Sequence, residues 1–249
     1  MESGSSRVSR PDLLWGLIAL AVALIVGLWI VSGAVRDLRR AGDQVSVTGS
    51  ARQPIRSDFA IWRGSVAAQA PTLQSAATAL QEHAAKVRDF LREQGVADSS
   101  LTVRPIETWA VPEFTANGRE TGRVVGYRLT QWFEVRSLDV DAITKLSQQS
   151  GALISRGVPL VSSPPEYHYT KLAEVRVSLL ADATKDARDR AVAIAEAAGG
   201  TVGVVREARM GVFQITPRYS TEVSDYGIND LSSIDKDVTA VVRVSFTVR

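Results

Sequence analysis

The sequence predicts an α+β fold with antiparallel sheets and three packed helices, preceded by one transmembrane helix. Near the N-terminus, residues 13–35 form a run without a single charged side chain. After residue 44, stretches with a hydrophobic period of two alternate with stretches of helical period, in the order ββ-α-ββ-α-ββ-α-ββ. Because paired strands between single helices are typical of antiparallel sheets, this order indicates α+β and not a doubly wound parallel sheet.

The composition excludes several classes of site. The chain has 249 residues, with 29 Lys and Arg against 27 Asp and Glu, two His and no Cys. Without cysteine there is no disulfide framework, thiolate metal site or cysteine nucleophile, and two histidines cannot make a three-histidine zinc site. A net charge of +2 provides no broad basic surface, so we expect no nucleic-acid partner.

The uncharged run is long enough to cross a bilayer. At about 1.5 Å per residue a helix over 13–35 spans roughly 35 Å, and Trp15 and Trp29 lie near its ends, where indoles favour the interface. A cleaved signal peptide is the alternative, since Ser32-Gly33-Ala34 offers small residues for cleavage. The run exceeds a usual signal-peptide core, so we predict an uncleaved anchor whose partner is membrane lipid.

The charges beside this run leave its orientation open. Arg7 and Arg10 precede it, whereas four arginines lie within residues 36–52, so the positive-inside rule would put the large domain in the cytoplasm. A short tail before a long domain is also typical of a signal-anchor, and long domains translocate despite their charge. Ala19, Ala23 and Gly27 could let two such helices approach closely, although small residues are common in these segments.

The predicted organisation has four parts. They are an N-terminal tail at 1–12, the transmembrane anchor at 13–35, a juxtamembrane linker at 36–43 and an α+β domain at 44–249.

The elements of the first half follow from periodicity, caps and turns. A helix begins after the N-cap Thr72 and ends at Gly95, and Asn117-Gly118 marks a turn between two strands. The strands are predicted at 45–48, 58–69, 101–111 and 124–136. The expected buried faces comprise Ala60, Trp62, Gly64, Val66 and Ala68, the helical stripe Leu73, Ala77, Leu80, Ala84, Val87 and Leu91, and Val125, Tyr127, Leu129, Phe133 and Val135.

The second half continues the same alternation. Asp139 caps a short helix that ends at Gly151, and Asp182 is the expected cap of a helix over 183–198 that ends at Gly199-Gly200. Its stripe of small side chains (Ala183, Ala187, Ala191, Ile194 and Ala198) suits close packing on a sheet. Strands are predicted at 152–161, 172–180, 202–215 and 238–248, with a long loop at 217–237.

Three segments resemble the SIMPL-domain family of bacterial envelope proteins. Val45-x-Val47-x-Gly49 resembles the family's opening strand, and the helix end FLREQG with the following strand resembles its middle. The passage ATKDARDRAVAIAEAAGGTVGVV, residues 183–205, is similar to the family's alanine-rich helix, glycine stop and next strand. The order and spacing of these segments carry the resemblance, which covers residues 44–249.

The resemblance implies a periplasmic α+β domain, a link to oxidative or general stress defence, and assembly into ring-like or barrel-like homo-oligomers. It supplies no catalytic residues. The chain departs from the family's pattern in two places. The family's first strand is commonly followed by a Pro-Asp step, whereas here three residues separate Pro54 from Asp58. The middle hairpin often carries a Pro-x-Tyr element, and the comparable place here reads Pro112-Glu113-Phe114. With the anchor, the resemblance implies a single-pass protein of the bacterial inner membrane.

The sequence contains no residues that we assign to a catalytic, cofactor-binding or metal site. His168 could pair with Glu166 for proton transfer or metal binding, but a strand start with aromatic packing explains it as well, and His83 is expected at the boundary of a helix stripe. No Gly-x-Ser-x-Gly elbow or Walker motif occurs. The loop 217–237 holds carboxylates whose spacing does not fit an EF-hand, and apolar side chains that could dock on a neighbour. These are Glu222, Asp225, Asp230, Asp235 and Asp237, and Tyr219, Tyr226, Ile228, Leu231 and Ile234.

The sequence supports three candidate functions to different degrees. The favoured one is a non-enzymatic, membrane-anchored envelope protein whose periplasmic domain self-associates. The second is a ligand-binding or sensory module that regulates a membrane partner. The third, a hydrolase that uses His168 and the loop carboxylates, has the least support.

Overall fold

The computed structural model describes residues 15, 18, 20–25, 27–29 and 44–249. The described residues before 30 are helical and exposed. Within the described part of the chain, no helix is both long and apolar enough to span a membrane. The tail 1–12, the linker 36–43 and much of the predicted anchor 13–35 lie outside the described residues.

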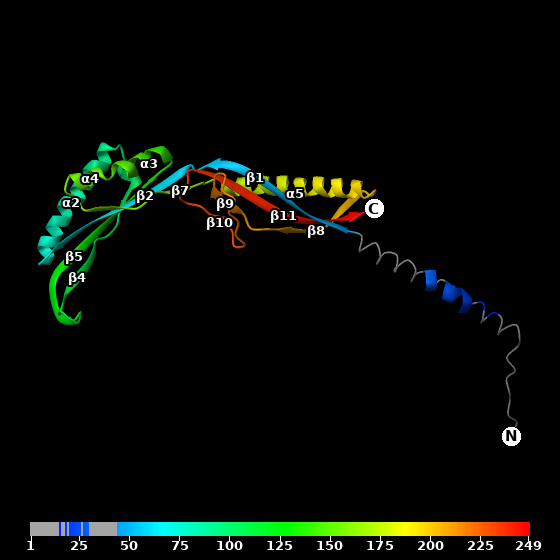
Figure 1. The fold of residues 1–249 in the computed structure, drawn as a ribbon, viewed down its shortest axis with the longest axis horizontal. Coiled ribbons are helices and arrows are strands. Elements are labelled where there is room, and N and C mark those ends of the chain that lie inside the picture. Colours follow the sequence, from blue (N-terminus) through cyan, green and yellow to red (C-terminus); the bar gives the residue numbers. More distant parts are fainter. Residues whose placement is uncertain (1–14, 16–17, 19, 26, 30–43) are drawn as a thin grey trace, which may run out of the picture. The chain divides into compact units, whose positions relative to one another are not determined.

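The chain after residue 44 alternates helices and strands (Figure 1). The helices are α2 (Leu73–Glu93), α3 (Val140–Gln149), α4 (Ala152–Ser155) and α5 (Leu172–Ala197), with a 3₁₀ turn at Asp98–Ser100. The strands are β1 (Gln44–Arg56), β2 (Phe59–Ala70), β3 (Leu101–Val103), β4 (Glu107–Phe114), β5 (Glu120–Ser137), β6 (Leu160–Ser162), β7 (Glu166–His168), β8 (Val202–Met210), β9 (Gln214–Pro217), β10 (Ile228–Asn229) and β11 (Asp235–Val248).

These elements form two compact units. The first contains the chain up to Ser50 together with Ala183–Gly211 and Val242–Arg249, and the second contains Ala51–Asp182 and Val212–Val241. The elements β1, α5 and β11 contribute residues to both units. The ladders of β2 with β5, β6 and β7, of β5 with β3 and β4, and of β11 with β8 and β9 are antiparallel, and β9 with β10 is parallel. This strand content agrees with the predicted α+β class.

The second unit is built on a six-stranded sheet. Its order is β3-β5-β2-β6, with β4 also paired to β5 and β7 to β2. The β2–β5 ladder runs from Ala60 opposite Ser137 to Ala70 opposite Tyr127. One face of this sheet packs against α2 and α3. The largest fully buried side chains of this core include Trp62 and Phe133 from the sheet and Phe90 from α2. Because side chains alternate across a strand, the residues between these buried positions lie on the other face.

The predicted caps of α2 and α3 and the stop of α2 are confirmed. Thr72 Oγ1 accepts a hydrogen bond from the Ser75 amide at 3.2 Å, and Asp139 Oδ1 accepts one from the Ala142 amide at 2.9 Å. Gly95 has a φ of 77°, the left-handed conformation that glycine adopts without a Cβ clash. Leu73, expected in the buried stripe of α2, is exposed, and Ala76 and Phe90 are buried in that helix.

In the first unit, β8 pairs with β11 from Met210 opposite Val242 to Val202 opposite Val248. Gly49 of β1 lies directly against α5, where a Cβ would overlap the Ala183 carbonyl oxygen and the Ala187 amide nitrogen. The buried side chains of α5 step by four residues: Val175, Leu179, Ala183, Ala187, Ala191 and Ala195. Ala195 therefore takes the place that was predicted for Ile194 and Ala198, both of which are exposed.

Several predicted elements of the second half are wrong. Residues 152–161 form α4 and the start of β6, and residues 172–180 belong to α5, so Asp182 lies inside the helix and is not its cap. The alternation of Val175 and Val177 resembles a strand, but Val177 is exposed and the four-residue stripe continues into the alanines. The region 202–215 is divided into β8 and β9, and the loop 217–237 contains β10 and the start of β11.

Candidate functional site

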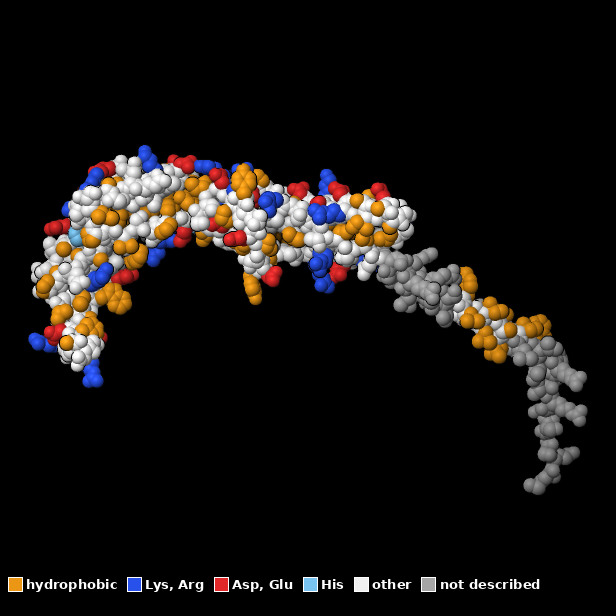
Figure 2. All heavy atoms as spheres, in the orientation of Figure 1, with side chains coloured by type: hydrophobic (Ala, Val, Ile, Leu, Met, Phe, Trp, Pro, Cys, Tyr) orange, Lys and Arg blue, Asp and Glu red, His pale blue; other side chains and the backbone are white. Residues whose placement is uncertain are grey.

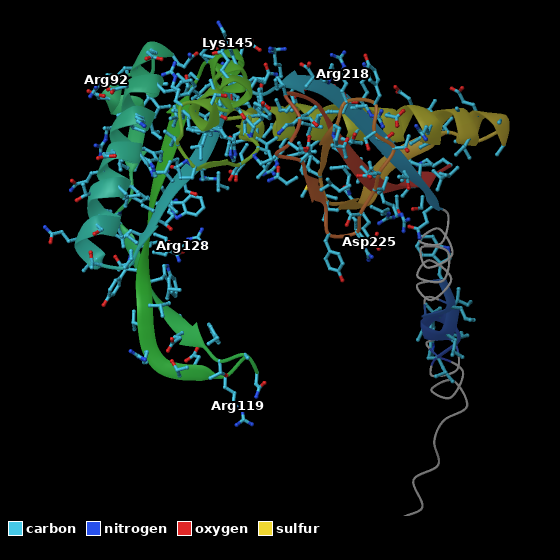
Figure 3. All side chains as sticks on the ribbon, turned by 60° about the vertical axis from the view of Figure 1, so that its left-hand side comes forward. Arg92, Arg119, Arg128, Lys145, Arg218 and Asp225 are labelled. Atoms are coloured by element: carbon cyan, nitrogen blue, oxygen red, sulfur yellow. The ribbon has the colours of Figure 1, made fainter. Side chains whose placement is uncertain are left out.

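The hairpin of β4 and β5 projects from the second unit. Its turn is formed by residues 115–119, where the Thr115 amide donates to the Arg119 carbonyl at 2.8 Å and Gly118 has a φ of 74°. This confirms the predicted Asn117-Gly118 turn. Arg119 lies at the tip of the hairpin, away from helix α2, which carries Arg92 (Figure 3).

The hairpin exposes apolar side chains that a monomer would normally bury. Trp109 is 65% exposed, and three other large apolar side chains of the hairpin are exposed to solvent: Phe114, Val124 and Val125. The expectation that Val125 lies on a buried face is therefore wrong, because this end of β5 belongs to the projecting hairpin. In the described part of the chain β4 pairs with β5 alone, so its other edge offers free backbone donors and acceptors. We call these four side chains and the free edge of β4 the hairpin surface. Apolar side chains beside an open strand edge favour contact with another polypeptide.

The charges on the hairpin balance. Residues 107–128 contain three acidic and three basic side chains: Glu107, Glu113, Arg119, Glu120, Arg123 and Arg128. A surface with no net charge does not repel its own copy, and its unlike charges can pair when two copies meet antiparallel.

A second exposed segment is the loop 218–227. Tyr226 is 97% exposed, and hydrophobic atoms project at the end of this loop (Figure 2). The base of the loop is held by Gln214, whose Nε2 donates to the Ser224 carbonyl at 2.7 Å. Tyr219, also exposed, has a φ of 66°, and its amide donates to Asp237 Oδ2 at 3.2 Å.

Other apolar residues predicted to dock from the loop 217–237 pack within the chain instead. Ile234 lies against the core under α2 and α3. Leu231 lines a small cavity of about 120 Å³. Tyr219 and Tyr226 are therefore the predicted docking residues that the fold leaves fully open to solvent.

The face of the six-stranded sheet that is opposite α2 and α3 carries a charged cluster. Glu134 of β5 is directly opposite Arg63 of β2. Its Oε2 accepts from Arg63 Nε at 2.7 Å and from Arg104 Nη2 at 3.4 Å, and its Oε1 accepts from Arg136 Nε at 2.7 Å. Arg63 also donates to Glu166 Oε1 through Nη1 at 2.5 Å. The three guanidiniums leave the Glu134 side chain only 3% exposed.

This arrangement stabilises opposite charges on the two central strands. The hydrogen bond from Arg63, opposed by burial and supported by Arg136, lowers the pKa of the Glu134 carboxyl below its usual value of 4.5. The hydrogen bond to Glu134 also raises the pKa of Arg63. Glu134 therefore stays ionised, and its negative charge orients the surrounding arginines.

Lys236 is a second buried charge that the sequence analysis did not single out. It is 2% exposed, and its Nζ donates to the carbonyl oxygens of Tyr167 at 2.7 Å and Asp230 at 2.5 Å. Burial lowers its pKa. The ammonium joins β7 to the segment before β11, which is a structural role.

The two histidines lie apart from each other and from any metal-ligand set. His168 Nε2 is 3.6 Å from Glu166 Oε2, and the His168 ring contacts Phe59 with centroids 6.1 Å apart. Glu166 accepts its short hydrogen bond from Arg63 instead. His83 is half-buried on α2. Over residues 44–249 and the described helical positions before 30, no three His, Asp or Glu side chains gather as metal ligands.

The loop carboxylates bind their own surroundings. Asp230 accepts from the Ser232 amide at 2.8 Å, Asp235 lies 3.6 Å from Arg56, and Asp237 lies 3.8 Å from Arg52. Glu222 and Asp225 are exposed. This distribution does not make the calcium site that was considered from the sequence.

Comparison with known proteins places the chain in a family. Residues 45–246 match SIMPL, described as a protein of unknown function (DUF541), and the chain belongs to this family. It is 24% identical over 213 residues to the uncharacterized protein YggE of Edwardsiella ictaluri, covering 83% of this chain and 84% of that protein. A crystal structure of an uncharacterized conserved protein from Listeria innocua aligns with 80% of this chain and 92% of that one, at 12% identity and a TM-score of 0.21.

Proposed function

We propose that this chain is a non-enzymatic, membrane-anchored envelope protein whose SIMPL domain self-associates in the periplasm and acts in oxidative or general stress defence. The observation that carries the proposal is the hairpin surface, where exposed Trp109 and Phe114 lie on the open edge strand β4. The uncharged run 13–35 supports the anchor. The periplasmic location and the stress role are expectations from the family resemblance.

A second copy of this chain is the partner that the hairpin surface fits best. Two β4 edges can pair antiparallel about a two-fold axis, so that each strand supplies the hydrogen bonds that the other lacks. This pairing buries the same apolar side chains from both copies. The balanced charges of residues 107–128 add no repulsion.

A double variant of the hairpin tests this proposal. Replacing Trp109→Ser and Phe114→Ser removes two apolar contacts from each copy, so the oligomer should dissociate at concentrations where the unchanged protein stays assembled. The mass of the full-length protein in detergent, measured by light scattering over a dilution series, reports the change. Leu138→Ser is the matched control, because Leu138 is an exposed apolar residue outside the hairpin.

Equal masses for the double variant and the unchanged oligomer would exclude the hairpin as the interface. A monomeric unchanged protein would contradict self-association altogether.

A ligand-binding or sensory module is the second candidate. The observation that favours it is a cleft beside Glu134 with a volume of about 400 Å³. This lies within the usual range for small-molecule sites, about 300–1,000 Å³.

A further inference from the structure

The cleft beside Glu134 lies on the sheet face opposite α2 and α3. It is lined by six residues: Arg63, Arg104, Glu107, Trp132, Phe133 and Glu134. The register explains this set, because Arg63 pairs with Glu134, and Glu107 pairs with Thr130 on the same face of β5. The Arg104 amide donates to the Trp132 carbonyl at 3.0 Å, which places Arg104 beside this face.

Of the three arginines around Glu134, Arg104 makes the longest contact with a carboxylate. Glu134 forms its short contacts with Arg63 and Arg136, and Glu166 forms one with Arg63. Three arginines thus share two carboxylates, and Arg104 makes a single contact at 3.4 Å. A guanidinium has five donors arranged in a fork, so Arg104 keeps donors for a further acceptor.

Trp132 lines the same cleft as Arg104. Its ring is half-buried on the face that carries Glu134. An indole face binds planar groups by stacking, and a guanidinium binds a carboxylate through two parallel hydrogen bonds. A ligand that combines a ring with a carboxylate can use both groups at once.

We propose that this cleft binds a small planar carboxylate, with Arg104 holding the carboxylate and Trp132 the ring. Glu134 also lines the cleft, but its side chain is only 3% exposed, so it acts as a positioning residue whose charge orients the arginines. Glu107 at the cleft disfavours ligands of higher negative charge, such as phosphate dianions. The cleft shares only Glu107 of β4 with the hairpin, and neither proposal requires the other.

The test uses the full-length protein in detergent with fluorinated benzoate as the probe, observed by fluorine NMR against a blank of empty micelles. Benzoate should bind in the millimolar range, as expected for one ring and one charge. Acetate, which lacks the ring, and benzylamine, which reverses the charge, should each compete poorly for the site. Benzylamine displacing the probe as well as unlabelled benzoate would overturn the assignment of a carboxylate site.

Two arginine variants separate direct contact from support of the network. Arg104 and Arg136 both contact Glu134 and are 56% and 57% exposed, but only Arg104 lines the cleft. Arg104→Ala should weaken benzoate binding about tenfold, whereas Arg136→Ala should leave it within about twofold. Trp132→Leu should remove the preference for benzoate over acetate.

Equal affinities for the Arg104→Ala variant and the unchanged protein would exclude the site. Equal losses for Arg104→Ala and Arg136→Ala, with both variants folded by circular dichroism, would assign the effect to the network and overturn the contact. The Trp109→Ser and Phe114→Ser double variant should bind benzoate normally, so failure of this site and failure of self-association give different results.

Discussion

At the scale of single residues, Glu134 is a nearly buried carboxylate surrounded by partly exposed arginines. It lies on the sheet face opposite the helices, yet Arg63, Arg104 and Arg136 bury it almost completely. A carboxylate shielded from water stays charged only if its partners replace the lost hydration, which the guanidinium hydrogen bonds do. The cluster therefore joins β2 to β5 by charge where no apolar core covers the sheet.

Changing Glu134→Gln should destabilise the second unit by about 1–2 kcal/mol near pH 7, because the charge-assisted hydrogen bonds become neutral ones. The pKa of Glu134 is lowered by folding, so the unfolded chain binds more protons just below pH 4.5. The stability that this carboxylate contributes is present above that value and is lost as the pH falls through its lower folded pKa.

Urea unfolding of both proteins across this pH range measures the difference. The advantage of the unchanged protein should shrink as the pH falls below 4.5. Glu82→Gln, at an exposed carboxylate of α2, is the control and should have no effect at either end. If the difference in the free energy of unfolding between the unchanged protein and the Glu134→Gln variant stayed the same at low pH, the charge of Glu134 would not be the cause of that difference.

Only part of the environment of Glu134 can be predicted from the sequence. The predicted face of Leu129, Phe133 and Val135 leaves Glu134 and Arg136 on the opposite face of the strand, where the structure has them. The partner Arg63 could not be predicted, because the register that sets it opposite Glu134 depends on the whole β2–β5 ladder. Alternation identifies the face of a strand, and pairing across strands requires the fold.

At the scale of elements, predictions succeeded where local chemistry determines the boundary. Thr72, Asp139, Gly95 and Gly199 each occupy the cap or stop that was predicted, since these positions depend on a few neighbouring atoms. The predicted start of α5 was eleven residues too late, because the spacing of apolar residues in 172–182 fits a strand as well as a helix. The buried side chains step by four residues from Val175 to Ala195, which is the spacing of a helix along its whole length.

The contact between β1 and α5 makes Gly49 a sensitive position. Gly49→Ala should lower the free energy of unfolding by about 1–3 kcal/mol, because the added Cβ overlaps backbone atoms of Ala183 and Ala187 that cannot move independently. Chemical denaturation measures the loss.

Gly151→Ala is the matched control for this change. Its Cβ would meet no atom within 4 Å, and its φ of −58° suits alanine. This substitution should leave stability unchanged or raise it slightly. Equal effects of the two substitutions would contradict the close approach of α5 to β1.

At the scale of the whole molecule, membership of the SIMPL family was anticipated from the order of three segments and is now established over residues 45–246. The sequence pointed to the loop 217–237 as the contact region. The fold adds the hairpin, because the exposure of Trp109 and Phe114 depends on β4 being an edge strand. Periodicity alone does not distinguish an edge strand from a central one.

The absence of cysteine from the chain allows the most direct test of self-association. Ala110 is a small exposed residue in the middle of β4, so Ala110→Cys places one thiol on the proposed interface. Glu82→Cys, on the exposed face of α2, is the control. A short bis-maleimide that does not cross the inner membrane is added to intact cells, and the products are separated by denaturing electrophoresis.

Self-association through the hairpin in the periplasm predicts a cross-linked dimer for Ala110→Cys and none for Glu82→Cys. Cross-linking only after the inner membrane is broken would place the domain on the cytoplasmic side. No Ala110→Cys dimer in either preparation would contradict an assembly built on β4.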